Sequence, residues 1–253
     1  MATNNSNLLR IANPIAFIAT IIVNGLAGST TLLGGQDTAA ISDANFTLIT
    51  PAGYVFAIWG IIYTLLGMFV IYQALPSQKG KEYQTKIGWL FVLSNLINII
   101  WLFLWQYEQL ILSVPLMFML LATLIMIYQR LDIGKSKPEL KEKIAIQLPF
   151  STYLGWITIA SIANVATTLV SIEWDSFGIS TEIWASTIII IALLVASIVI
   201  VTRKDIAYTL VIAWAFVGIS VAQTNQNIIT LTQISTAIAL ILLATVILYK
   251  KLR

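Results

Sequence analysis

The sequence predicts an all-α protein, a polytopic membrane bundle of eight transmembrane helices with both termini in the cytoplasm. Three observations carry this prediction. Of the 253 residues, 58% are hydrophobic and only 10% are charged, whereas a soluble domain has about 25% charged residues. The hydrophobic residues gather in long runs, and the basic residues lie between these runs in a regular alternation. A chain of this composition covers a surface that faces lipid rather than water.

Eight apolar runs are long enough to cross a bilayer. About 20 residues of α-helix span roughly 30 Å of hydrocarbon, and a helix satisfies its own backbone polar groups there. The runs cover residues 11–29, 53–75, 87–106, 110–130, 144–170, 183–202, 206–223 and 229–249. Each run is therefore expected to form one membrane-spanning helix.

The charges fix the expected orientation of these helices. All 14 Lys and Arg residues lie near the two termini, or in or beside the connections that follow the second, fourth and sixth runs. The other connections contain no basic residue, and three of them are acidic. Because basic residues stay on the cytoplasmic side of a membrane, both termini are expected inside. The net charge of +3 then reflects topology, so the expected partner is the lipid bilayer and not a nucleic acid.

Several functional classes are excluded by what the chain lacks. Without Cys, disulfide, thiolate and iron–sulfur chemistry are excluded, and without His the commonest ligand of metals and haem iron is missing. A retinal protein needs a Lys in the middle of a span, whereas every Lys here lies at a cytoplasmic end. No paired carboxylates or activated nucleophile are visible in the runs. The sequence therefore assigns no catalytic or metal-binding residue and favours a protein that is not an enzyme.

The first run, residues 11–29, contains signals for a helix start and for helix packing. Asn13 and Pro14 fit the N-cap and first position of a helix. Gly25 and Gly28 suit close contact with a neighbouring helix. A cleaved signal peptide is the alternative, because the residues from Gly25 to Ala27 resemble a small-x-small cleavage site. The single basic residue before the run favours a membrane helix.

The connection of residues 30–50 is unusually long and leads into an aromatic run. Loops of this length often serve as lids or binding segments, although a plain tether fits the sequence equally well. Pro51 fits the start of the second helix. Phe56, Trp59 and Tyr63 follow at steps of three and four, which places them on one helix face.

The third run combines amides with indoles. Asn95, Asn98, Trp101 and Trp105 share one helix face. Because an amide in hydrocarbon needs a hydrogen-bond partner, this face is expected to point into the bundle. It fits a pocket wall, and it fits equally a set of asparagines that hold helices together. A tight turn at 106–109 should make the third and fourth helices an antiparallel hairpin.

The fifth run repeats the pattern of aromatic and amide residues. Tyr153, Trp156, Ala160 and Asn164 follow at steps of three, four and four. Pro149 predicts a kink near the start of this helix. The stripes of the second, third and fifth helices are expected to line one cavity. The run 183–202 should instead face lipid, because it has almost no polar residue in its middle.

The order and spacing of these residues resemble the tryptophan-rich sensory protein, or translocator protein, family (TspO/MBR). The resemblance covers about residues 11–170, five of the eight expected helices. Its matching positions are Pro51, Phe56, Trp59, Tyr63, Asn95, Trp101, Tyr153, Trp156, Ala160 and Asn164. The chain departs from the family in two respects. The Trp that normally precedes Pro51 is absent, and three helices follow the fifth.

The resemblance implies a five-helix bundle with a pocket open toward the loop between its first two helices. Members of the family bind tetrapyrroles such as protoporphyrin IX and haem, some bind cholesterol, and transport and sensing have been proposed for them. We therefore expect residues 1–173 to form a TspO-like five-helix core and residues 174–253 a three-helix extension. A homodimer is compatible with this arrangement.

The leading functional hypothesis is a membrane protein that binds a planar hydrophobic ligand, porphyrin-like or sterol-like, for sensing or transport. The expected ligand-binding residues are Phe56, Trp59, Tyr63, Asn95, Asn98, Trp101, Tyr153, Trp156 and Asn164. No cofactor is required, and without His a metal-free tetrapyrrole fits better than haem. A facilitative transporter of small solutes and a structural or regulatory membrane protein without a ligand are the alternatives. Short loops and the lack of Cys favour a bacterial inner membrane.

Overall fold

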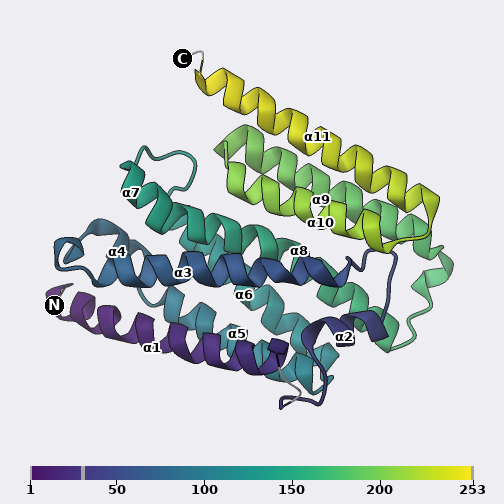
Figure 1. Cartoon of the computed structure of the whole chain (residues 1–253), viewed down its shortest axis with the longest axis horizontal. Helices are drawn as coiled ribbons and strands as arrows, with labels where there is room; N and C mark the ends of the chain where they lie inside the picture. Colours follow the sequence, from purple (N-terminus) through teal and green to yellow (C-terminus); the bar gives the residue numbers. More distant parts are fainter. Residues whose placement is uncertain (1, 30–31, 252–253) are drawn as a thin grey trace.

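In the computed structural model, which describes residues 2–29 and 32–251, the chain forms a bundle of helices along a common long axis (Figure 1). Among these residues, eight helices have 17 residues or more: α1 (Ala2–Ser29), α3 (Ile58–Ala74), α5 (Leu90–Gln106), α6 (Leu110–Arg130), α8 (Leu148–Ser171), α9 (Thr181–Arg203), α10 (Ile206–Ala222) and α11 (Gln226–Lys251). The connections contain the shorter helices α2 (Thr38–Ala44), α4 (Glu82–Ile87) and α7 (Leu140–Glu142). They also contain 3₁₀ turns at Gly53–Ala57, Pro76–Gln78 and Ser176–Gly178 and a π-helical turn at Lys143–Gln147.

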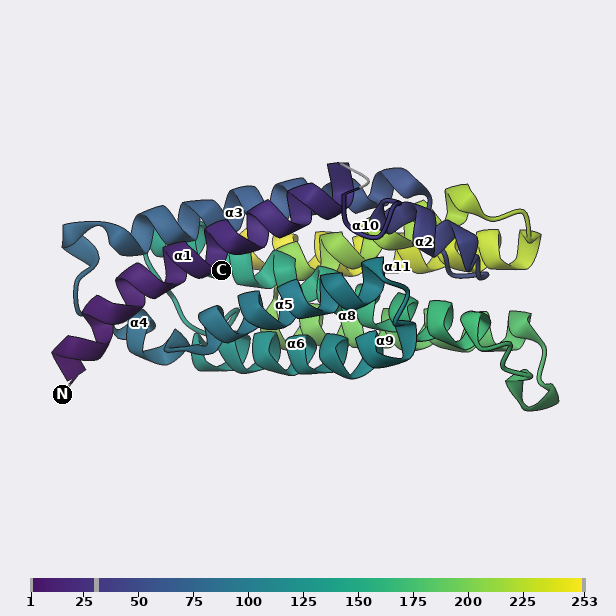
Figure 2. The same cartoon turned by 90° about the horizontal axis from the view of Figure 1, so that it is seen from below.

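Each predicted apolar run overlaps one of the long helices, although α3 begins at Ile58 after a 3₁₀ turn and not at Pro51 as predicted. In the described part of the chain, six helices are long and apolar enough to cross a membrane. One of the six is α3 together with the 3₁₀ turn before it, Gly53–Ala74. The other two long helices, α5 and α10, are apolar but have only 17 residues each, so the number of eight spans remains a prediction. α1 begins and α11 ends toward the same end of the bundle (Figures 1 and 2). An even number of spans requires this placement, while the cytoplasmic location of that end also remains a prediction.

The first helix starts earlier than the sequence predicts. α1 begins at Ala2, so Pro14 lies inside the helix and Asn13 is not its N-cap. The Asn13 amide instead donates from Nδ2 to Oε1 of Gln73 on α3, at 2.8 Å. A proline inside a helix removes one intrahelical hydrogen bond, and the packing of α1 against α5 and α3 holds the helix together around it. Asn13 therefore marks a contact between helices rather than a helix start.

The predicted kink at Pro149 takes a different form. Pro149 is the second residue of α8, and the helix continues into it from the π-helical turn, so its missing N–H removes one hydrogen bond from the ladder. The irregularity comes just before it, in the π-helical turn Lys143–Gln147. A π-helical turn absorbs an interruption of the hydrogen-bond ladder without ending the helix. The fifth run is thus one helical segment, Leu140–Ser171.

α8 organises the core of the bundle, because it packs against α6, α3 and α10. Its buried Phe150 meets Phe69 of α3 and Phe91 of α5, with ring centroids 5.0 and 5.9 Å away. The rings of Phe69 and Phe91 are 5.1 Å apart, edge to face. On the other side of α8, α9, α10 and α11 form a further layer (Figure 1). The last three helices are therefore joined to the first five mainly through α10, with a second contact at the end of α9, where Arg203 pairs with Asp132 at 3.3 Å.

Candidate ligand-binding pocket

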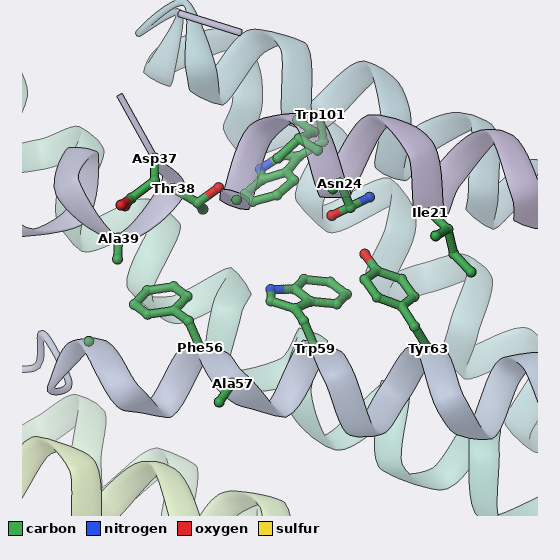
Figure 3. A pocket seen from close by; sticks show the side chains of 14 residues that line it. Ile21, Asn24, Asp37, Thr38, Ala39, Phe56, Ala57, Trp59, Tyr63 and Trp101 are labelled. Carbon is green, nitrogen blue, oxygen red and sulfur yellow. The ribbon is translucent and has the colours of Figure 1, made fainter. Parts of the chain in front are cut away.

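A cavity of about 450 Å³ lies between α1, α2, α3 and α5. It is at the end of the bundle where α1 connects to α2, which is the position that the family resemblance implies. Figure 3 shows its two faces, an aromatic row on α3 and the residues of α1 and α2 opposite. The cavity is thus a partly open cleft, lined by segments that are far apart in the sequence.

One wall is an aromatic row. Phe56, Trp59 and Tyr63 all line the cavity, and their rings follow one another along α3 and the 3₁₀ turn before it (Figure 3). Their spacing of three and four residues places them on one face, as the sequence predicts. The rings of Trp59 and Tyr63 are stacked, with centroids 5.3 Å apart and planes only 16° apart. The wall therefore presents a continuous apolar surface.

The wall opposite the aromatic row has little side-chain bulk. It is formed by α1, where Gly25 and Gly28 line the cavity together with Ile21 and Asn24. A Cβ added at either glycine would meet no described atom within 4 Å. The prediction of close helix contact at these glycines is wrong, because α1 packs mainly on α5 and its glycines face the cavity. Their missing side chains leave the space in front of the aromatic row open.

A single amide fixes the connection between α1 and α2. Gln106, at the end of α5, is 1% exposed. Its Nε2 donates toward the backbone carbonyls of Ala27 at 3.2 Å, Leu33 at 3.2 Å and Gln36 at 2.8 Å. Gly34 has a φ of +70° in this connection, and a Cβ there would lie 1.9 Å from the Gln106 carbonyl oxygen, so only glycine fits. The described part of this connection, residues 32–36, is therefore held against the end of α5 and is not a loose tether.

α2 contributes a third side of the cavity with Asp37, Thr38 and Ala39. The Asp37 carboxylate also caps this helix, since it accepts a hydrogen bond from the backbone N–H of Ala40 at 2.8 Å. Trp105 of α5 donates from Nε1 to the carbonyl of Thr38 at 3.2 Å. Sequence reasoning missed Asp37, Thr38, Ala39 and Gln106. The only available signal was an amide at the end of an apolar helix, beside an unusually long connection.

A second aromatic layer supports the row on α3. Tyr153 and Trp156 of α8 are buried behind it. Trp59 meets both rings edge to face, with centroids 5.9 Å and 6.1 Å away, and Phe56 meets Trp156 at 5.9 Å. The cavity wall includes no residue of α8. α8 thus holds the aromatic row in place from behind.

Trp101 of α5 lines the cavity and is oriented by α8. It donates from Nε1 to Oδ1 of Asn164 at 2.8 Å, and Asn164 donates from Nδ2 to the Ser113 hydroxyl at 2.8 Å. Asn164 is 1% exposed, so both ends of its amide are used inside the bundle. This asparagine acts as a structural link between α5, α6 and α8.

The two asparagines of α5 differ from each other. Asn95 donates from Nδ2 to the carbonyl of Phe91 in its own helix at 2.7 Å. Asn98 accepts from Nδ2 of Asn24 at 2.9 Å, and Asn24 is a cavity residue. Asn98 is therefore bonded to a residue of the cavity wall, whereas the Asn95 side chain bonds within its own helix.

The sequence matches a known protein family over most of its length. The family model described as TSPO-like protein matches residues 10–248. The chain belongs to the TSPO-like protein family. The match includes α9, α10 and α11, so it extends beyond the five helices that carry the resemblance in sequence. Neither a curated protein nor a solved structure matches the chain. With its apolar helices, this TSPO-like protein is an integral, multi-pass membrane protein.

The expected ligand-binding residues of this TSPO-like protein fall into three groups. Four of them line the cavity: Phe56, Trp59, Tyr63 and Trp101. Two others, Tyr153 and Trp156, form the layer behind. The three asparagines at 95, 98 and 164 bond to protein groups. The residues of α1 and α2 complete the wall.

Three polar groups around the cavity of the TSPO-like protein lack a hydrogen-bond partner among the described residues. They are the Tyr63 hydroxyl, the Trp156 Nε1 and the Asn98 Nδ2, all buried. In Figure 3 the Tyr63 hydroxyl points toward Asn24. Buried polar groups in native proteins almost always bond to protein, ordered water or a bound molecule. In the described ranges, no group of three acidic residues could hold a metal ion.

Proposed function

We propose that this TSPO-like protein binds a flat hydrophobic molecule in the cavity between α1, α2, α3 and α5, for sensing or transport. The observation that carries the proposal is the pairing of two unlike walls. Phe56, Trp59 and Tyr63 form an aromatic surface, and Gly25 and Gly28 leave the space in front of it free. A flat ring system stacks on such a surface and fills such a slot.

The size and polarity of the cavity support a ligand of this class. Its volume of about 450 Å³ falls within the range of roughly 300–1,000 Å³ that small-molecule sites occupy. The unpartnered Tyr63 hydroxyl is suited to donate to a carbonyl or carboxylate at the edge of a ligand. A metal-free tetrapyrrole such as protoporphyrin IX and a sterol-like molecule both fit these features. The chain contains no His to serve as an axial ligand for haem.

The interior of the bundle supports binding rather than free permeation of small solutes. Along the same helices, toward the other end of the bundle, the rings of Phe17, Phe69, Phe91 and Phe150 pack together. All four side chains are buried. A small solute that entered the cavity would have to separate these rings to pass farther. Facilitative transport therefore needs a second conformation, whereas binding does not.

The direct test is a titration of the purified protein with protoporphyrin IX and with a sterol, followed by Trp fluorescence and porphyrin absorbance. We expect saturable binding to the wild-type protein. Trp59→Ala should weaken it about tenfold, because an aromatic contact contributes roughly 1 kcal/mol beyond area burial. Trp89→Ala is the matched control, since Trp89 is 45% exposed and lies outside the cavity wall.

A steric variant sharpens the test. Gly25→Leu should abolish binding because the new side chain occupies the slot, while the protein still folds because no described atom lies within 4 Å of the new Cβ. Ala237→Leu, on an exposed position of α11, adds a similar bulk elsewhere and should leave binding unchanged. Unaltered affinity in both Trp59→Ala and Gly25→Leu would contradict the proposed site.

A further inference from the structure

The segment that leads into α3 forms part of the cavity but has little regular structure of its own. Gly53, Phe56 and Ala57 line the cavity. They belong to the 3₁₀ turn Gly53–Ala57, and residues 47–52 before it are not helical. Because a 3₁₀ turn has poorer hydrogen-bond geometry than an α-helix, the position of this segment depends on its tertiary contacts. Its hydrogen bonds to other elements come from α10 and its C-cap residue, while Phe56 also packs against Trp156 of α8.

Gln223, at the end of α10, holds the first part of this segment. Its Nε2 donates to the carbonyl of Thr47 at 3.1 Å and to the carbonyl of Thr50 at 3.1 Å. The side chain is 6% exposed. One amide group thus pairs with two backbone carbonyls that belong to no helix. Without it, both carbonyls would lose a buried donor.

Gly218 of α10 brings the two backbones into direct contact. The N–H of Ala52 donates to the carbonyl of Gly218 at 3.0 Å. A Cβ at Gly218 would lie 2.1 Å from Cγ2 of Val55 and 3.4 Å from Cβ of Pro51. Val55 is fully buried, so its methyl group has no free space to move into. Only glycine allows this approach.

Trp214, one turn earlier, holds the 3₁₀ turn itself. Its Nε1 donates to the carbonyl of Val55 at 3.3 Å. Its ring packs edge to face against Tyr54, with centroids 5.3 Å apart. In Figure 1 the dark-blue segment that leads into α3 reaches the yellow-green end of α10. Two residues of α10 and its C-cap Gln223 therefore contact six of the nine residues from 47 to 55.

We propose that α10 positions the wall of the ligand pocket. Trp214, Gly218 and Gln223 act as positioning residues that set the place of residues 47–57, and with it the place of Phe56 at the cavity. The inference rests on the proposed function for the meaning of the cavity. It assigns a role to α10, one of the last three helices, since ligand binding and the packing of α10 become linked. Such a linkage is reciprocal, so a ligand that orders the wall also stabilises the packing of α10.

The first test compares Gln223→Leu with Gln233→Leu, a matched change at an exposed position of α11. Hydrogen exchange is measured on both ligand-free proteins. In Gln223→Leu, peptides that cover 47–57 should exchange about tenfold faster, because two hydrogen bonds are lost, while peptides of α6 keep their rates. Affinity for protoporphyrin IX should fall about tenfold, equivalent to ~1.4 kcal/mol. Gln233→Leu should change neither quantity.

The second test uses size compensation between two contacting residues. Gly218→Ala should weaken ligand binding by about tenfold, because its Cβ displaces Val55 and the 3₁₀ turn with it. Val55→Ala removes the methyl group that the new Cβ would strike. The double variant should therefore bind more tightly than Gly218→Ala alone. A general loss of stability would instead make the two effects add.

The two proposals fail in different ways. Unchanged exchange of 47–57 in Gln223→Leu, or additive losses in the double variant, would overturn the role of α10. Failure of the wild-type protein to bind protoporphyrin IX or a sterol would overturn the proposed function, and the wild-type titration alone shows it. In that case the exchange rates of the ligand-free variants still decide whether α10 fixes the segment.

Discussion

Two pairs of glycines show how differently the two halves of this bundle are built. Gly25 and Gly28 of α1 face the cavity, and a Cβ on either would meet no described atom within 4 Å. At Gly155 of α8, a Cβ would lie 3.1 Å from Cβ of Val211 and 3.2 Å from the carbonyl oxygen of Tyr208. At Gly218 of α10 the nearest atom would be only 2.1 Å away. Glycine therefore leaves space at the cavity in α1, whereas in α8 and α10 it allows a close packing contact.

The difference separates the part of the bundle that is suited to admit a ligand from the part that supports it. α8 and α10 approach each other closely at Gly155, and α10 approaches the segment before α3 at Gly218. Residues of α1 and α3 line the cavity instead. In membranes, small residues allow helices to pack tightly because hydrocarbon supplies little driving force for association. Here that use applies to Gly155 and Gly218, and the glycines of α1 do not share it.

The largest loss of stability is expected from adding a side chain at Gly155, where α8 and α10 are in close contact. Gly155→Leu should lower the free energy of unfolding by about 3 kcal/mol, since inserting several carbons into a packed contact forces α8 and α10 apart. Thermal unfolding in one detergent, followed by circular dichroism, measures the loss. Gly25→Leu is the control and should unfold near the wild-type temperature. Equal losses in the two variants would remove the distinction between the two glycine sites.

A smaller loss of stability is expected when Asn164, which links α5, α6 and α8, is replaced. Asn164→Leu should destabilise the protein by about 2 kcal/mol, because the buried N–H of Trp101 loses its acceptor. Asn98→Leu should cost about 1 kcal/mol or less, because it removes one hydrogen bond together with a buried donor that has no partner among the described residues. Unfolding curves of the two variants in the same detergent compare them. A larger loss for Asn98→Leu would show that the cavity-side amide is the structural one.

The positions of the helices could be predicted from the sequence because hydropathy decides them. The run 110–130 corresponds to α6, Leu110–Arg130, and the run 206–223 corresponds to α10, Ile206–Ala222. In hydrocarbon a backbone that is not hydrogen-bonded is too costly, so an apolar run has little alternative to a helix. The start of α1 was wrong because Asn13 and Pro14 have the same local chemistry at a helix start and in a helix that continues through them.

The candidate site could be predicted only where it depends on one helix. Phe56, Trp59 and Tyr63 share a face because of their spacing, which the sequence contains. The opposite wall depends on how α1 is placed, and no local pattern distinguishes a glycine in a packed contact from one that faces a cavity. Gln106 and Gln223 each hold backbone carbonyls far away in the chain. Such partners exist only after the bundle has formed.

The smallest expected change in stability is a gain, and it tests the α1 wall of the cavity at Gly25. Gly25→Ala should raise the free energy of unfolding by about 0.5–1 kcal/mol, because alanine favours a helix interior over glycine and the added Cβ meets no described atom within 4 Å. The same methyl group narrows the slot in front of Trp59, so affinity for protoporphyrin IX should fall several-fold. Thermal unfolding and titration of one protein sample measure both changes. Stability and binding would then move in opposite directions, which a packing role for Gly25 does not allow. A fall in both quantities would show instead that α1 makes a close helix contact at this glycine.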